Sequence, residues 1–288
     1  MCEAKSVDDS GAPKPEHDRR CALHAERGPS EHMSLGRRKV TLTERERWVG
    51  NRVAEAYAGR PPYPAALVDA LAALAGDEPS TIVDVGAGAG HLALPLAARG
   101  LRVIAVDAAE GMLEVLGARA AQAGVNVETQ HATAEALPLT AASAELAIVA
   151  DALHFLDAHR AGDELARVLK PGAALAVVQV EFAATPFMQA VQAAMREAAP
   201  RRLRALDAAR VQLAARAGVK LEFAGSFPCS TPLTAAELER LLSSISFIGP
   251  AMNAERSAAF RARVQAIPEP RVWARVLHLY IGTRRRRR

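Results

Sequence analysis

The sequence has few cysteines, few aromatic residues and no long hydrophobic run, and each shortage excludes a class of protein. Its three cysteines, Cys2, Cys21 and Cys229, lack the spacing of a metal site or a disulfide framework. An odd, scattered count suits a reducing compartment, so we expect a cytoplasmic protein. Phe, Trp and Tyr make up only 4% of the chain, which argues against stacking platforms for single-stranded nucleic acid.

No stretch approaches the roughly 20 consecutive apolar residues that a membrane-spanning helix needs. The first residues also lack the apolar segment of a secretory signal. We therefore expect no membrane partner. Because His, Asp and Glu show no clustering with ligand spacing, we expect no metal site.

The formal net charge of +4 comes from the end of the sequence. Residues Arg284 to Arg288 are all arginine and supply +5, so the remaining residues sum to −1. Such a basic run is a candidate tether for RNA or an acidic partner. The near-neutral remainder gives no reason to expect a nucleic-acid partner.

Composition and periodicity divide the chain into three parts. Residues 1–40 mix Pro, Gly, Ser and charged residues without a hydrophobic period, which is typical of a disordered leader. Periodic sequence covers 41–283, which we interpret as one domain, and 284–288 form the basic tail.

Short β-branched runs alternate with helical segments along this domain. Strands are predicted at 81–85, 101–106, 125–130, 145–150, 174–182, 219–227 and 271–282. Helices are predicted at about 44–58, 65–75, 90–99, 109–123, 158–169 and 234–244, and 185–218 is helical throughout.

Continuous apolar strands separated by helices are typical of a parallel sheet that is covered on both faces. The pattern predicts a Rossmann-like, doubly wound α/β fold with a mostly parallel seven-stranded sheet. Segment 185–218 interrupts the alternation, and we interpret it as a helical insertion after the fifth strand. We expect it to lie on the substrate side, over the carboxyl ends of the strands, where such sheets bind ligands.

The first strand ends in a glycine-rich loop. Gly86, Gly88 and Gly90 follow the apolar run directly, and glycines let the backbone turn sharply and approach a ligand closely. The dinucleotide fingerprint requires its third glycine at position 91, which is His91 here. Asp107 ends the next strand, where an acid can bind both hydroxyls of a ribose. A nucleoside ligand is indicated, and the glycine spacing disfavours a nicotinamide-dependent oxidoreductase.

With these motifs the sequence resembles the class I S-adenosylmethionine (SAM)-dependent methyltransferases, and within them the small-molecule, type 11-like branch. The resemblance covers about residues 52–282. Besides the glycine loop, the matching blocks are Arg52–Pro64, 103–113, 132–139, 150–157 and 166–173. It implies SAM as the cofactor and S-adenosylhomocysteine as the product.

The resemblance also implies roles for individual residues. Those implied to bind the cofactor are Tyr57, Arg60, Asp84, Gly86, Gly88, Gly90, Asp107, Met112, Thr133, Ala134 and Asp151. Arg60 would reach the SAM carboxylate, Asp84 the ammonium end, Asp107 the ribose and Met112 the adenine. Thr133 and Ala134 stand where the family usually has an acid for the adenine amino group, which leaves more of that recognition to backbone groups. Asp151 has the alternative role of capping the segment that follows it.

His154 is the candidate catalytic residue, because it follows the fourth strand and histidine titrates near neutral pH. Its alternative role is structural, packed on Phe155. Four arginines in the insertion, Arg196, Arg201, Arg202 and Arg204, are candidates for meeting an anionic acceptor.

The resemblance implies methyl transfer to a small molecule, most often to a carboxylate or hydroxyl oxygen, through proximity and orientation. Two alternatives stay open: methylation of RNA or protein, and a non-catalytic SAM-binding scaffold. The sequence indicates neither the acceptor nor the oligomeric state.

Overall fold

A computed structural model describes residues 53–76, 80–198, 206–245, 248 and 252–285. The predicted leader 1–40, most of the helix predicted at 44–58, the arginines 201, 202 and 204 and the last three residues lie outside the described residues. The described residues belong to one compact unit of the chain.

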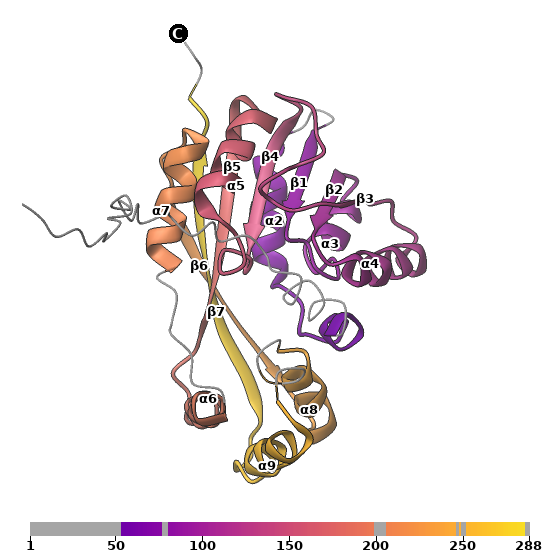
Figure 1. The fold of residues 1–288 in the computed structure, drawn as a ribbon, viewed down its shortest axis with the longest axis vertical. Helices are drawn as coiled ribbons and strands as arrows, with labels where there is room; N and C mark the ends of the chain where they lie inside the picture. Colours follow the sequence, from indigo (N-terminus) through magenta and orange to yellow (C-terminus); the bar gives the residue numbers. More distant parts are fainter. Residues whose placement is uncertain (1–52, 77–79, 199–205, 246–247, 249–251, 286–288) are drawn as a thin grey trace, which may run out of the picture. The chain divides into compact units, whose positions relative to one another are not determined.

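The centre of this unit is a seven-stranded mixed sheet, which confirms the predicted fold class (Figure 1). Its strands are β1 (Thr81–Val85), β2 (Arg102–Asp107), β3 (Glu128–His131), β4 (Ala144–Ala150), β5 (Leu169–Phe182), β6 (Glu222–Pro232) and β7 (Val272–Thr283). Their order is β3-β2-β1-β4-β5-β7-β6. The first five run parallel, and β7 is antiparallel to both β5 and β6.

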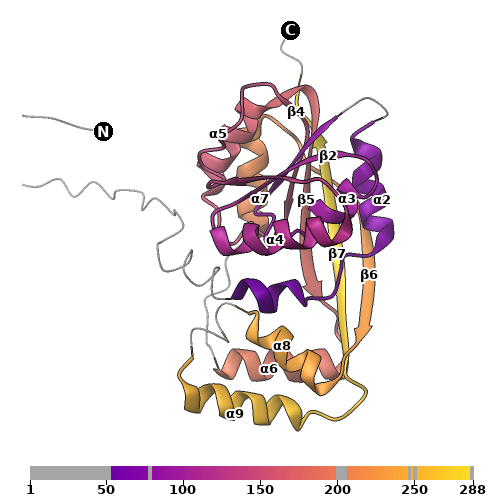
Figure 2. The same ribbon diagram turned by 90° about the vertical axis from the view of Figure 1, so that its right-hand side faces the viewer.

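Helices cover both faces of the sheet, as Figures 1 and 2 show. One apolar core contains residues of α2 (Ala65–Leu74), α3 (Ala93–Ala97) and α4 (Glu110–Ala123). The core of the opposite face contains residues of α5 (Ala158–Val168) and α7 (Leu206–Ala217). Neighbouring strand residues alternate between the two cores: Ile82 belongs to the first and Val83 to the second. Every residue of β1 is buried, because both faces are covered.

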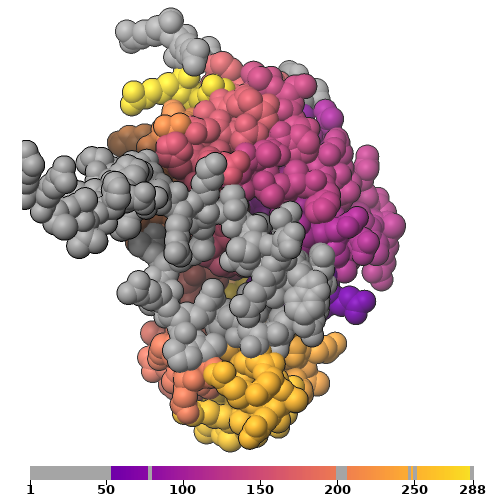
Figure 3. All heavy atoms as spheres, viewed as in Figure 1, coloured from indigo at the N-terminus to yellow at the C-terminus, as the bar shows by residue number. Residues whose placement is uncertain are grey.

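A third apolar core lies beyond the carboxyl ends of the parallel strands. It is formed by α6 (Pro186–Ala198), α8 (Ala235–Ser243) and α9 (Ala254–Gln265), together with Trp273 at the start of β7. We call these three helices the cap. The long strands β6 and β7 extend from the sheet to the cap (Figures 1 and 2). In the space-filling view, α8 and α9 form the lower, orange to yellow part of the visible surface (Figure 3).

The structure divides the insertion predicted at 185–218. Only α6 belongs to the cap, whereas α7 packs against α5 on the sheet, as a crossover helix does. The two helices approach closely at Gly162 in α5, where an added Cβ would lie 2.5 Å from Cβ of Arg216. The helix α9 was not predicted. The third strand begins at Glu128 rather than at residue 125.

Candidate functional site

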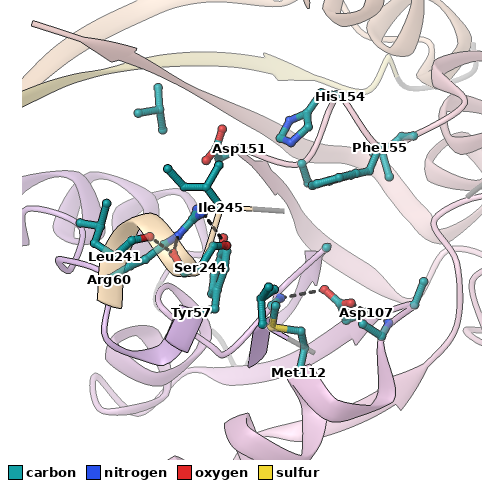
Figure 4. Close-up of a pocket in the computed structure, with 18 of the residues that line it drawn as sticks. Tyr57, Arg60, Asp107, Met112, Asp151, His154, Phe155, Leu241, Ser244 and Ile245 are labelled. Atoms are coloured by element: carbon teal, nitrogen blue, oxygen red, sulfur yellow. Dashed lines mark hydrogen bonds between the residues drawn. The ribbon is translucent and has the colours of Figure 1, made fainter. Parts of the chain in front are cut away.

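A cavity of about 320 Å³ lies between the carboxyl ends of β1, β2 and β4 and the cap. At its glycine-loop end the wall contains Gly86, Gly88, Val106, Asp107, Ala108, Ala109, Met112, Ala132, Ala134 and Ala152. At its cap end the wall contains Val180, Phe182, Met195, Leu241, Ser244, Ile245, Trp273 and Arg275. Figure 4 shows Asp107 and Met112 together on one side and Arg60, Leu241 and Ser244 on the other.

Two of the three predicted loop glycines line the cavity. Gly86, Gly88 and Gly90 all have positive φ, at 74°, 53° and 81°, which side chains rarely adopt. A Cβ on Gly88 would come within 3.2 Å of the Tyr57 ring, so glycine lets this ring lie on the loop. Gly90 does not line the cavity; a Cβ there would meet the Leu116 side chain of α4 at 2.8 Å. Gly90 therefore serves close helix packing.

Asp107 holds the glycine loop and the start of α4 through its carboxylate. One oxygen accepts a hydrogen bond from Gly88 N and the other from Ala109 N, both at 2.8 Å. Burial raises the pKa of this carboxyl, and the hydrogen bonds from the backbone oppose the rise. Each carboxylate oxygen can accept more than one hydrogen bond, so both retain capacity for a ligand hydroxyl. Met112, also buried, lies beside it in the wall.

Asp84 lies behind the loop and does not line the cavity. Its side chain is buried in β1, and burial, together with the charge of Asp107, raises its pKa to about 7. The backbone of Ala93 donates a hydrogen bond that opposes this rise. This carboxyl is therefore not placed to contact a ligand in the cavity directly.

Tyr57 and Arg60 form a contact between the loop and the cap. The guanidinium of Arg60 lies over the Tyr57 ring, 4.1 Å from its centre. Arg60 Nε donates to Ser244 Oγ at 2.9 Å, and Nη2 donates to the Ser244 carbonyl at 3.2 Å. Both residues line the cavity, and the two bonds to Ser244 use two of the five N–H donors of the guanidinium that was predicted to reach a cofactor carboxylate.

Asp151 and His154 lie between the two ends of the cavity. Asp151 has a φ of 49°, a left-handed conformation that Asp tolerates better than most residues. Its backbone N–H donates to Val178 O at 3.0 Å, so β5 supports the turn that presents its side chain to the cavity. The His154 ring packs on Phe155 with 3.9 Å between ring centres, and both line the wall.

In the segment after β3, Ala134 lines the cavity and Thr133 does not. The neighbouring Glu135 is buried and accepts a hydrogen bond from Asp157 N at 2.8 Å, so it joins two loops rather than facing the cavity. Arg196 on α6 is exposed and lies outside the wall. No group of three or more metal-ligating side chains occurs within the described ranges. No helix among these residues is long and apolar enough to cross a membrane.

Most of the cap end of the cavity was missed by sequence reasoning. Leu241, Ser244 and Ile245 come from the end of α8, and Trp273 and Arg275 from β7. None belongs to a recognisable motif. One signal was present: Trp273, Arg275, Leu277 and Leu279 alternate along β7, so an arginine interrupts an otherwise apolar strand face.

Comparison with known proteins identifies the domain. Residues 83–177 match the family model described as a methyltransferase domain. An uncharacterized methyltransferase of Mycobacterium tuberculosis is 38% identical over 146 residues, 51% of this chain and 55% of that protein. A demethylmenaquinone methyltransferase of Clavibacter sepedonicus is 37% identical over 121 residues, 42% of this chain and 48% of its own length. The matched segment thus spans about half the length of these relatives.

Solved structures share the fold. The YcgJ protein of Bacillus subtilis superposes with a TM-score of 0.54 at 22% identity, covering 76% of this chain and 98% of that one. The [4+2]-cyclase SpnF superposes with a TM-score of 0.51 at 18% identity, covering 80% and 85%. Together with the strand order and the glycine loop, these matches show that the chain contains a methyltransferase domain of the class I SAM-dependent type.

Proposed function

We propose that this protein transfers the methyl group of SAM to an oxygen, a carboxylate or a hydroxyl, of a small-molecule acceptor. The observation that carries the proposal is the single cavity that joins the glycine loop and Asp107 to an apolar wall supplied by the cap. A site of this kind has room for a cofactor at one end and an acceptor at the other.

The glycine-loop end suits the cofactor. Asp107 faces the cavity with acceptor capacity left on both oxygens, which fits a pair of ribose hydroxyls. Gly86 and Gly88 let a ligand approach the backbone, and Met112 offers an apolar, polarizable surface for a base. When bound, SAM supplies a methyl group that is already electrophilic on its sulfonium.

At the cap end, the chain's task is to align the acceptor and exclude water. Phe182, Met195 and Trp273 provide apolar walls that can hold an acceptor in a reactive orientation, which is worth on the order of 7–11 kcal/mol. A hydroxyl acceptor must lose its proton, and His154 lies between the two ends, where it can take it. A carboxylate acceptor needs no base, and His154 can then serve to position it.

The experiment that tests the proposal combines binding with transfer. Calorimetry with S-adenosylhomocysteine measures cofactor binding to the full chain. Labelled SAM is then incubated with the small-molecule, RNA and protein fractions of the source cell. The proposal expects label in the small-molecule fraction. Label confined to RNA or protein would favour a macromolecular acceptor, and binding without transfer to any fraction would favour a scaffold.

A further inference from the structure

Strand β7 changes its role along one face. Alternate residues of a strand point to the same side, so Trp273, Arg275, Leu277 and Leu279 share a face. Leu277 and Leu279 are buried in the core beneath α2, whereas Trp273 and Arg275 line the cavity. Arg275 therefore lies where the helices stop covering this face of the sheet and the cavity begins.

The guanidinium of Arg275 is held by neutral groups. Its Nη2 donates to the carbonyls of Pro61 and Pro62, both at 3.1 Å. Its Nε is buried and has no hydrogen-bond partner among the described residues. No described carboxylate lies within ion-pair distance of Arg275 either. Carbonyls fix the position of a cation without neutralising it, so the positive charge remains for a ligand.

The other cation of the wall, Arg60, is also held by neutral groups, but its Nε is already bonded. Arg60 is bonded twice to Ser244 and stacked on Tyr57. Of the two carboxylates of the wall, Asp107 lies at the glycine-loop end and Asp151 lies between the two ends. Arg275 is therefore the cation in this wall, within the described part of the chain, that is best placed to meet an anion.

The strand register places Arg275 far from the glycine loop. Asp151 N bonds to Val178 O, and Val178 pairs with Leu279. Arg275 pairs with Phe182, four residues further along β5, a distance of about 13 Å at the rise of a strand. The neighbouring rings of Phe182 and Trp273 are 5.1 Å apart in an edge-to-face arrangement. The cation is thus embedded in apolar and aromatic surface.

We propose that the acceptor carries a carboxylate that pairs with Arg275 and an apolar body that packs on Phe182 and Trp273. This assignment rests on the proposed function, because it names the substrate class of the same site. The carboxylate is an anchor, and the oxygen that receives the methyl group is a separate group nearer Asp151 and His154. The planar guanidinium of an arginine matches a carboxylate geometrically.

The test compares acids with their uncharged amides. The probes are benzoate, cinnamate, 2-naphthoate and decanoate, each paired with its primary amide at pH 8. Binding is read from the fluorescence of Trp273, the sole tryptophan in a background that carries Trp48→Phe. Titrations are run with and without saturating S-adenosylhomocysteine, so that failure of cofactor binding, which bears on the proposed function, is separated from failure of anion binding.

We expect at least one acid to bind about ten- to a hundredfold more tightly than its amide. Arg275→Met should abolish this preference, and Arg275→Lys, which keeps a donor and a charge, should retain part of it. Arg261→Met removes a surface guanidinium of α9 and should leave the preference unchanged. S-adenosylhomocysteine affinity should stay the same in all three variants.

Three results would overturn the assignment. One is a wild type that prefers none of the acids over its amide, whatever the variants do. Another is a preference that survives intact in the Arg275 variants. The third is a loss of S-adenosylhomocysteine affinity in a folded Arg275→Lys protein, which would assign the guanidinium to the cofactor. Should Arg275→Met fail to fold, the lysine variant decides.

Discussion

Asp107 is a single residue on which both the glycine loop and the proposed ribose contact depend. In Asp107→Asn one acceptor oxygen becomes an NH2 group, which cannot accept from Gly88 or Ala109 and offers one acceptor fewer to a ligand. We expect S-adenosylhomocysteine affinity to fall by about 1–3 kcal/mol in calorimetry. Asp69→Asn, at a surface carboxylate paired with Arg99, is the control and should bind normally. Equal affinity in both variants would exclude Asp107 from the cofactor site.

His154 can be tested separately from the cofactor. His154→Gln keeps a polar side chain but loses a group that titrates near neutral pH. If His154 takes the acceptor's proton, turnover should fall by about 10²–10⁴-fold while S-adenosylhomocysteine affinity is preserved. The pH profile of turnover should also lose its limb near neutrality. Unchanged kinetics would leave His154 with the packing role against Phe155.

Two buried groups close to the loop, Asp84 and His91, change the free energy of unfolding in opposite directions as the pH rises. Burial raises the pKa of Asp84 to about 7, so its contribution is fully present below the pKa of the unfolded chain, near 4, and is lost as the pH rises to 7. Burial, with the charge of Arg119 next in weight, lowers the pKa of His91 to about 4. Its contribution is present above about 6.5 and is lost as the pH falls to 4.

The two pH ranges overlap. Removing one group should therefore reveal how the other makes the free energy of unfolding depend on pH. Relative to wild type, Asp84→Asn should gain free energy of unfolding as the pH rises from 4 to 7, and the difference should level off above 7. His91→Asn should show the reverse difference between pH 4 and 6.5. Urea unfolding at half-unit pH steps measures both. Parallel pH profiles for wild type and Asp84→Asn would mean that Asp84 ionises at its ordinary pKa.

At the scale of helices, the contact between α5 and α7 depends on a glycine. A Cβ on Gly162 would lie 2.5 Å from Cβ of Arg216 and 2.7 Å from the carbonyl oxygen of Leu213. Gly162→Ala should therefore destabilise the protein by about 1–3 kcal/mol in urea unfolding, since the helices must separate. Gly117, on the exposed side of α4, has nothing within 4 Å of an added Cβ. Gly117→Ala should be stabilising by about 0.5–1 kcal/mol. Equal effects would show that α7 does not need this close approach.

The predictable elements are those whose local pattern decides their structure. The strands β1, β2 and β4 are short apolar runs buried on both faces, and the glycine loop follows from its own residues. The role of 206–217 was not predictable, because its helical periodicity is the same whether it packs on α5 or on the cap. The sequence of α9 is mostly polar. Its buried residues, Phe260 and Val264, pack in the core that α9 shares with α6 and α8, and the local pattern does not reveal that contact.

The same distinction applies to the site. The glycine-loop end comes from one stretch of sequence and was predicted, with Gly86, Gly88, Asp107 and Met112 in the wall. The cap end is assembled from α6, α8 and β7, far apart in sequence, so no spacing reveals it. Arg60 is an intermediate case: its presence in the wall was predicted, but its partner Ser244 lies 184 residues away.

At the scale of the whole molecule, the positive net charge comes from the arginine run 284–288. Arg284 directly follows β7 and is bonded to the start of β5: its N–H donates to Ala173 O at 2.8 Å, its carbonyl accepts from Gly172 N at 3.0 Å, and its side chain donates to Leu169 O. The tail predicted from the sequence therefore begins one residue later. Removing residues 285–288 lowers the formal net charge from +4 to zero.

Two truncations follow from this boundary. A chain ending at Arg284 should keep its thermal midpoint, its S-adenosylhomocysteine affinity and its methyl transfer to a small acceptor, because every wall residue in the described part of the chain is kept. A chain ending at Thr283 should lose about 1–3 kcal/mol of unfolding free energy, because it leaves the start of β5 without these partners. Calorimetry and urea unfolding separate the two effects. A strong loss of methyl transfer in the first truncation, with the fold intact, would mean that the arginines recruit the acceptor. Since four arginines bind polyanions far better than they bind a small apolar acid, such a loss would favour a macromolecular acceptor.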